Sequence, residues 1–498
     1  MAHTSVDHGH EARYAGLLLH PTSLPGSYGI GDLGDELIAF LDWAASAGAR
    51  IWQVLPLNPP GYGNSPYGCL SSFGGNPMLI SPQRLLQEGL IGAADVADLP
   101  KFPNDFVDFE QAGAWKWALL RKAWHNAASR RNELDRFVEE EREWLDDLAL
   151  YMALKDAAGG APWWEWETKV AQREPRAIAK ARRELADDIG FHQFVQWLFL
   201  RQWSAVRAAA AARDIRIMGD VPIYVAQDSA DVWSNRELFQ LDDAGLPTVV
   251  AGVPPDYFSA TGQRWGNPLY RWDVLRETKY AWWIERVRAN LRLADIIRLD
   301  HFRGFAAYWE IPAYEPTAIH GRWMPGPGRS LFDAIREALG SLPLVAEDLG
   351  FITPEVHELR HAVKLPGMKI LQFGFAQVDS PHLPHRYEVD TVVYSGTHDN
   401  DTARGWFETA PAEEQHLART YLGEECNDIS WSLIRTAFTS VARTAIVPVQ
   451  DVLGLGSTAR MNRPGNSHDN WSWRLPSGAL TRAHAARLRR LAEISGRV

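Results

Sequence analysis

The chain is short of cysteine: its 498 residues include only Cys69 and Cys426. No disulfide framework is therefore predicted, and a reducing compartment fits. Basic charge is also scarce, and a formal net charge of −11 argues against a nucleic-acid partner or an anionic membrane surface. No run reaches the roughly eighteen apolar residues of a membrane-spanning helix, and the first residues lack the apolar core of a secretory signal. We therefore expect a cytoplasmic protein with no membrane partner.

Motifs for metals and cofactors are missing as well. There is no Gly-rich phosphate loop of the Walker or Rossmann kind. The histidines of "HTSVDHGH" (3–10) have no fixed ligand spacing and favour a flexible tail over residues 1–13. The segment "LDDAGLP" (241–247) offers too few oxygen ligands for a calcium loop and favours a hairpin turn. We predict no metal and no cofactor.

Aromatic residues, in contrast, are plentiful, with 22 tryptophans. Most of these are explained by burial in a core, because large aromatic side chains bury well. Sugar rings also stack their C–H faces on aromatic planes. The tryptophan content alone is thus a weak indication of carbohydrate binding.

Apolar strand-like segments alternate with helical segments along the chain. An α/β fold with a parallel sheet follows from such alternation, and polar residues at the strand ends favour a (β/α)8 barrel (TIM barrel), whose active site lies at that face. Tyr280, Ile284, Val287 and Leu291 show the spacing of an amphipathic helix. The expected strands lie at 14–20, 51–57, 214–224, 295–300, 342–348 and 391–399, and the expected helices at 35–50 and 189–212.

Residues 68–188 interrupt this alternation. They are rich in helix formers and charge, so we predict a mainly helical insertion subdomain in a barrel loop. The charged run at 130–147 is expected to be a solvated helix face. The catalytic barrel would then consist of residues 14–67 and 189–498, with long active-site loops.

The segment "IIRLDHFRGF" (296–305) joins an apolar strand to a charged end. Because side chains alternate along a strand, Arg298 and Asp300 share one face and Ile297 and Leu299 the other. A positive neighbour lowers the pKa of a carboxyl group, so Arg298 is expected to keep Asp300 ionised. The strand end therefore predicts a charged site at the mouth of the barrel.

Carboxylates stand at four strand ends: Asp220 in "MGDVPIY", Asp300, Glu347 in "VAEDLG" and Asp399 in "GTHDN". Any one of them could simply cap the following helix, and Asp348 is best explained that way. Four in succession, two with flanking His or Arg, favour a shared site.

These motifs resemble the four ordered regions of the α-amylase clan, and in detail the 4-α-glucanotransferases of glycoside hydrolase family 77 (amylomaltases, disproportionating enzymes). Further segments carry the same resemblance, which covers nearly the whole chain: "LLLHPTSLPGSYGIGDLG" (17–34), "WQVLPLNPPGYGNSPY" (52–67), "VAGVPPDYFSATGQRWGNPLYRW" (250–272), "LPGMKILQFGF" (365–375) and "RMNRPGNSHDNWSWR" (460–474).

The resemblance implies a retaining double displacement on α-1,4-glucans. Asp300 would be the nucleophile, Glu347 the acid and then the base, and Asp399 the stabiliser of the transition state. Glu347, at the end of an apolar strand, is expected to have a raised pKa. A retaining pair of carboxyl groups stands roughly 5–5.5 Å apart.

The family also implies residues that bind sugar. Trp265 could instead pack under its own loop, a simpler alternative that stays open. Asp220 suits a structural or sugar-binding role more than a catalytic one. The predicted substrate-binding set is Ser65, Tyr67, Asp220, Asp256, Tyr257, Trp265, Arg298, His301, His398 and Asn462.

Two other functions remain open from the sequence. One is an α-1,4-glucan hydrolase of the same clan, which uses the same residues but transfers to water. The other is a non-catalytic glucan-binding protein, against which the retention of all three carboxylates argues. The expected partners are maltooligosaccharides and starch- or glycogen-type α-1,4-glucans, and the expected state is a monomer or a weak homo-oligomer.

Overall fold

The computed structural model describes residues 12–255, 259–423, 428–466 and 468–498. At its centre is a sheet of eight parallel strands in the order β10-β11-β12-β1-β2-β3-β6-β9. The N–H of Ala346, at the end of β9, donates to the carbonyl of Pro366, just before β10, at 2.9 Å. This bond links the two edges, so the predicted barrel is nearly closed. The strands are β1 Tyr14–Leu18, β2 Ile51–Gln53, β3 Arg216–Pro222, β6 Ile296–Asp300, β9 Leu344–Ala346, β10 Gly367–Ile370, β11 Thr391–Tyr394 and β12 Thr444–Pro448.

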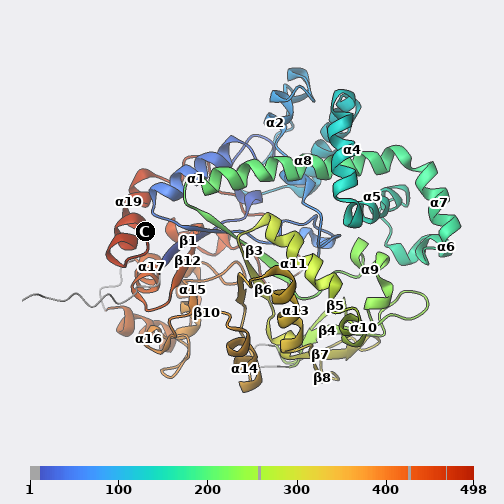
Figure 1. The fold of residues 1–498 in the computed structure, drawn as a ribbon. Helices are drawn as coiled ribbons and strands as arrows, with labels where there is room; N and C mark the ends of the chain where they lie inside the picture. The colour runs from blue at the N-terminus through green and yellow to red at the C-terminus, as the bar shows by residue number, and fades with distance from the viewer. Residues whose placement is uncertain (1–11, 256–258, 424–427, 467) are drawn as a thin grey trace, which may run out of the picture.

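Helices surround the barrel (Figure 1). The helix expected at 35–50 ends at Ser46, and Gly48 turns the chain toward β2 with φ +79°, which glycine adopts at low cost. Between β10 and β11 the described residues form only the short 3-10 turns η8 Leu371–Gly374 and η9 Pro384–Arg386. The outer helices are α1 Asp35–Ser46, α8 Ala186–Ala211, α11 Ala281–Leu293, α13 Arg329–Leu339, α14 Pro354–Val363, α15 Ala403–Thr409, α16 Ala412–Leu422, α17 Ile429–Thr439 and α19 Arg482–Ile494.

Further helices follow β2, within the stretch predicted as a helical insertion. Four of them, α3 Phe109–His125, α4 Arg131–Glu140, α5 Arg142–Ala157 and α7 Pro175–Glu184, pack on α8, which is long enough to contact α5 with one part and α1 with another (Figure 1). Half of residues 130–147 are exposed, while Leu134 and Leu145 are buried, so the run is a solvated face only in part. The apolar side chains of α3 belong to the same core cluster as those of β2. These helices are α2 Pro82–Gln87, α3 Phe109–His125, α4 Arg131–Glu140, α5 Arg142–Ala157, α6 Thr168–Ala171 and α7 Pro175–Glu184.

A second, antiparallel sheet stands beside the barrel in the order β5-β4-β7-β8 (Figure 1). The sequence pattern did not predict it, because several of its short strands are largely exposed and show no apolar alternation. Its strands are β4 Val249–Val253, β5 Gln263–Pro268, β7 Ala307–Pro312 and β8 Arg322–Pro325. The short helices α9 Ala230–Ser234, α10 Trp272–Glu277, α12 Arg303–Ala306 and α18 Val449–Val452 complete the described fold. The predicted turn at 241–247 is present, closed by the bridge between Leu241 and Pro247.

Candidate active site

The carboxyl end of β6 carries the charged pair predicted from the sequence. Ile297 and Leu299 pack outward in the apolar core, while Arg298 is only 3% exposed inside the barrel. Arg298 Nη2 lies 2.9 Å from Asp300 Oδ1, and Arg298 Nη1 donates to both oxygens of Asp220 at 2.8 Å. The guanidinium of Arg298 thus binds carboxylates from two neighbouring strands, β3 and β6.

The net effect on the Asp300 pKa is opposite to the sequence prediction. Burial, the largest effect, together with the charges of Asp220 and Asp399, outweighs the lowering by Arg298 and raises the pKa of Asp300 to about 6. Arg298 does lower the pKa of Asp300, as predicted, but the sequence showed neither the burial, which has the largest effect, nor that Arg298 also binds Asp220, 78 positions away in the chain. Arg298 therefore limits the rise in the pKa of Asp300 but does not reverse it.

Glu347 follows β9 and is held by the backbone. Its Oε2 accepts from the N–H of His301 at 2.7 Å, and its Oε1 accepts from the N–H of Leu349 at 3.1 Å. Burial, with the nearby charge of Asp300, raises the pKa of Glu347 well above its usual value, as predicted. His301, whose N–H makes this hydrogen bond, has a left-handed backbone conformation with φ +51°. The residue after Asp300 thus orients Glu347.

Asp399 lies in the loop after β11 and has a different environment. Burial alone would raise its pKa. The charge of His398 and hydrogen bonds from His398 and Asn462 outweigh burial and hold the pKa of Asp399 well below its ordinary value. Asn462 Nδ2 donates to Asp399 Oδ1 at 2.6 Å, and His398 Nε2 lies 3.2 Å from Asp399 Oδ2. Asp399 is therefore a carboxylate that stays ionised beside Asp300.

These side chains surround a pocket of about 250 Å³ at the mouth of the barrel. Trp265 is 39% exposed at its wall and its ring packs edge-on against His301 at 4.8 Å, so this side chain is available to a ligand. A larger groove of about 1360 Å³, beside β7 and β8, includes none of the predicted site residues. The lining of the smaller pocket is Ser65, Tyr67, Pro222, Ile223, Tyr224, Trp265, Asn267, Asp300, Asp399, Asn462, Pro464 and Trp471.

Six predicted site residues therefore line the pocket: Ser65, Tyr67, Trp265, Asp300, Asp399 and Asn462. Four others adjoin it: Glu347 and His301 contact each other next to Asp300, His398 contacts Asp399, and Arg298 lies beneath Asp300. Asp220 is fully buried under the pocket, where it supports Arg298, and its contact with sugar stays a prediction. Asp256 and Tyr257 lie outside the residues that the structure describes.

Among the polar and aromatic lining residues, the sequence analysis did not single out three: Tyr224, Asn267 and Trp471. Asn267 Nδ2 donates to the carbonyl of Val225 at 2.9 Å. The Trp471 ring lies 5.8 Å from the ring of Tyr67. All three stand inside motifs quoted above, so motif membership was the available signal, and only the fold distinguishes them from their neighbours.

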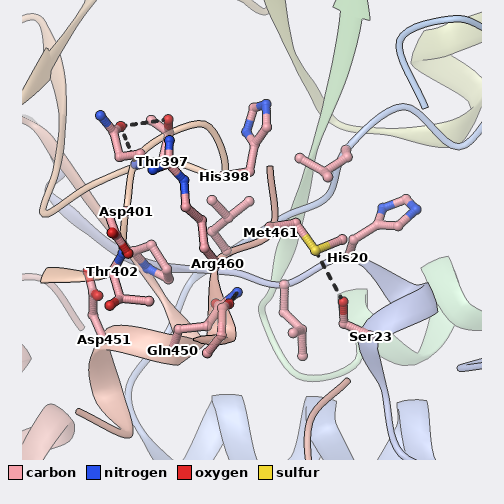
Figure 2. Close-up of a pocket in the computed structure, with 16 residues that line it drawn as sticks. His20, Ser23, Thr397, His398, Asp401, Thr402, Gln450, Asp451, Arg460 and Met461 are labelled. Carbon is pink, nitrogen blue, oxygen red and sulfur yellow. Dashed lines mark hydrogen bonds between the residues drawn. The ribbon is translucent and has the colours of Figure 1, made fainter. Parts of the chain in front are cut away.

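A small cavity of about 30 Å³ lies behind the loop that carries His398 (Figure 2). It has room for one or two waters at most, not for a sugar. Asn400 accepts hydrogen bonds at 2.9 Å from both the N–H and the hydroxyl of Thr397, as the dashed lines show. Burial, and then the charge of His398, lowers the pKa of His20 to about 3. This region keeps the Asp399 loop in place and is not a substrate site.

Within the described residues, no group of three His, Cys, Asp or Glu side chains could hold a metal ion. Over the same part of the chain, no helix is long and apolar enough to cross a membrane.

A nearly closed parallel barrel that gathers three carboxylates at its mouth is the arrangement of an enzyme acting on glycosidic bonds. The family model described as 4-alpha-glucanotransferase matches residues 19–481. The chain belongs to this family and is a glucan-transferring enzyme.

Individual relatives agree. A 4-alpha-glucanotransferase of Thermus thermophilus is 51% identical over 98% of this chain and 99% of its own length. One from Synechocystis sp. is 49% identical over 98% of each chain. Among solved structures, an amylomaltase from Streptococcus agalactiae in complex with acarbose superposes with a TM-score of 0.95 and 38% identity, over 97% of this chain and 99% of its own.

Proposed function

We propose that the chain transfers a segment of an α-1,4-glucan to the 4-hydroxyl of a second glucan or of glucose, by a retaining double displacement. The observation that carries this proposal is the contact between two neighbouring strand ends. Asp300 is paired with Arg298, and the residue that follows it, His301, donates to Glu347. These contacts support a charged nucleophile and a proton donor at neighbouring strand ends, and their separation of roughly 5–5.5 Å, which retention requires, stays a prediction.

In the first step the Asp300 carboxylate attacks the anomeric carbon, and the glycosidic C–O bond breaks. The proton of Glu347 passes to the departing oxygen, and the raised pKa of Glu347 supports its protonated state before the reaction. In the second step an acceptor hydroxyl attacks the same carbon and releases Asp300, while Glu347 takes the acceptor's proton back.

Asp399 has the complementary role. Its lowered pKa keeps it ionised, so it can accept hydrogen bonds from sugar hydroxyls and stabilise positive charge on the ring. Tyr67, Trp265 and Trp471 supply aromatic faces in the same pocket, and Ser65 and Asn462 supply polar groups. This combination suits a glucan ring with apolar faces and hydroxyl edges.

The substrates we propose are maltooligosaccharides and starch- or glycogen-type α-1,4-glucans. Acarbose, found in the Streptococcus agalactiae relative, is a suitable first probe of binding. A monomeric or weakly associating state and a cytoplasmic location remain predictions.

Incubation with maltotriose decides between transfer and hydrolysis. Transfer yields glucose and a ladder of longer maltooligosaccharides with almost no increase in total reducing ends. Chromatography of the products, together with a reducing-end assay, measures both quantities. Reducing ends that rise in step with substrate loss would identify a hydrolase, and bound but unaltered maltotriose would identify a binding protein.

Trp265→Ala tests the wall of the pocket. The Trp265 ring packs against His301, and its removal opens the site to water. We therefore expect hydrolysis to increase relative to transfer. Trp323→Ala is a matched control, because Trp323 belongs to the same small sheet, is 37% exposed and does not line the pocket. An equal hydrolysis ratio in both variants would contradict the proposed role of Trp265.

A further inference from the structure

The hydroxyl of Tyr67 lies between two charged parts of the site. It is 2.8 Å from Asp220 Oδ2 and 2.8 Å from His398 Nε2. Tyr67 belongs to the loop after β2, whereas Asp220 lies near the end of β3 and His398 follows β11. One oxygen atom thus joins three strand ends of the barrel.

The number of protons determines the direction of each bond. A tyrosine hydroxyl has one proton, and the carboxylate of Asp220 can only accept. Tyr67 therefore donates to Asp220 and accepts from His398, which places a proton on His398 Nε2. The same N–H lies 3.2 Å from Asp399 Oδ2. The other ring nitrogen of His398, Nδ1, is buried without a hydrogen-bond partner among the described residues.

The chain of contacts continues on the other side. Asp220 binds Arg298 through both oxygens at 2.8 Å, and Arg298 binds Asp300 at 2.9 Å. A continuous series of hydrogen bonds and ion pairs therefore runs from Asp399, through His398 and Tyr67, to Asp220, Arg298 and Asp300.

We propose that the Tyr67 hydroxyl is a positioning group that couples the two halves of the site, in addition to any contact of its ring with sugar. It shares the Nε2–H of His398 with Asp399, so that the carboxylate keeps accepting capacity for substrate. It also neutralises part of the charge of Asp220, so that Arg298 remains available to Asp300. This inference rests on the proposed roles of Asp300 and Asp399.

The surroundings of Tyr67 support a neutral hydroxyl. Burial, and then the charge of Asp220, raises the pKa of Tyr67 well above its usual value, so the group keeps its proton at any working pH. Charged or titratable groups face Asp300 from several elements: Arg298 on its own strand, Asp220 from β3, Glu347 from the loop after β9, His398 and Asp399 from the loop after β11, and Tyr67 itself. Removal of the hydroxyl changes the balance among these groups in a predictable direction.

Tyr67→Phe removes one oxygen and keeps the ring. Without the donor, Asp220 attracts Arg298 more strongly, Asp300 loses part of its positive neighbour, and the pKa of Asp300 rises. The acid limb of kcat/KM for maltotriose should therefore move to higher pH. At the pH optimum we expect kcat to fall about tenfold, the usual effect of one hydrogen bond near charge, with a smaller change in KM.

Tyr151→Phe is the matched control. Tyr151 lies on α5, away from the pocket, is also fully buried, and its hydroxyl likewise donates to a carboxylate, Asp228 Oδ1, at 2.6 Å. It tests the loss of a buried tyrosine hydroxyl as such, and we expect an unchanged acid limb. Thermal unfolding of both variants checks that the fold is intact.

The outcomes separate this inference from the proposed function. An acid limb that stays in place in Tyr67→Phe, or moves equally in Tyr151→Phe, overturns the positioning role. Asp300→Asn, measured in parallel, tests the function itself: an inactive Asp300→Asn with an unmoved limb in Tyr67→Phe refutes only the coupling. An active Asp300→Asn, with deamidation excluded, refutes the nucleophile assignment and with it the basis of the inference.

Discussion

Asp300 is paired with the guanidinium of Arg298, which also binds the carboxylate of Asp220. Its side chain remains 28% exposed in the pocket, yet its pKa rises to about 6 because burial and the charges of Asp220 and Asp399 outweigh Arg298. Asp399, whose side chain is 41% exposed, has a lowered pKa because His398 and Asn462 both bind it. Two carboxylates in one pocket thus differ because their hydrogen-bond partners differ.

A pH profile follows from these shifts. Asp300 must be ionised to attack, so kcat/KM should fall as pH drops through about 6. Glu347 must be protonated to assist departure, and its raised pKa places the alkaline limb well above the usual range of a carboxyl group. Both limbs belong to the coupled pair. Initial rates with maltotriose from about pH 4 to 9 measure them, and activity that stays constant down to pH 5 would contradict the acid limb.

Glu347→Gln separates the two half-reactions. A glucosyl fluoride needs little acid assistance and should still load the enzyme, but no base remains to activate an acceptor. The glycosyl-enzyme should then accumulate on Asp300. Mass spectrometry of the intact protein, followed by peptide mapping, detects the adduct, and a label on another residue would refute the nucleophile assignment.

At the scale of elements, the turn after β6 has a strained backbone at a residue that contacts Glu347. His301 has φ +51°, and this conformation aims its N–H at Glu347 Oε2 while its ring packs on Trp265. Residues other than glycine adopt this left-handed backbone conformation at a cost of order 1 kcal/mol. The strand end thus stores a small strain that orients the acid.

His301→Gly and His301→Ala form a matched pair for this strain. Both remove the ring and keep the backbone N–H, but only alanine retains the cost of a positive φ. We expect the glycine variant to be more stable than the alanine variant by about 1 kcal/mol. Denaturant unfolding of the two proteins measures the difference, and equal stabilities would show that the turn is unstrained.

At the scale of the molecule, the end of the chain ties together the beginning and the last barrel strand. Arg497 is completely buried and donates to the carbonyls of Phe438, Ala442 and Arg443, near the end of α17 and the start of β12. It also donates to the carbonyl of Tyr14 at the start of β1, which pairs with β12. Arg497 therefore links the start of β1, the start of β12 and the end of α17.

Arg497→Ala should destabilise the whole barrel. Several buried carbonyls would lose their donor, with an expected cost of roughly 2–4 kcal/mol. Arg490→Ala, on the exposed face of α19, is the control and should change stability by less than about 0.5 kcal/mol. Thermal unfolding compares the two variants, and similar melting temperatures would argue against this stabilising role of Arg497.

Several features were predictable because they depend on neighbours in the chain. Apolar strands with polar ends indicated the barrel, and alternation along β6 placed Arg298 and Asp300 on one face. The exposed strands of the second sheet lack such a pattern and were missed. The helices following β2 share the core of the barrel, so the division at 68–188 stays a prediction.

The sequence by itself determined the barrel class, the three carboxylates at strand ends and the family, because periodicity and motifs are local properties. Tertiary structure decided the electrostatics of the site. Asp220 binds Arg298, 78 positions away in the chain, and Tyr67 contacts His398, 331 positions away. Burial determines how strongly such neighbouring charges act on one another. A pKa depends on what surrounds a group in space, so only the folded barrel could show that Arg298 is shared and that the pKa of Asp300 rises.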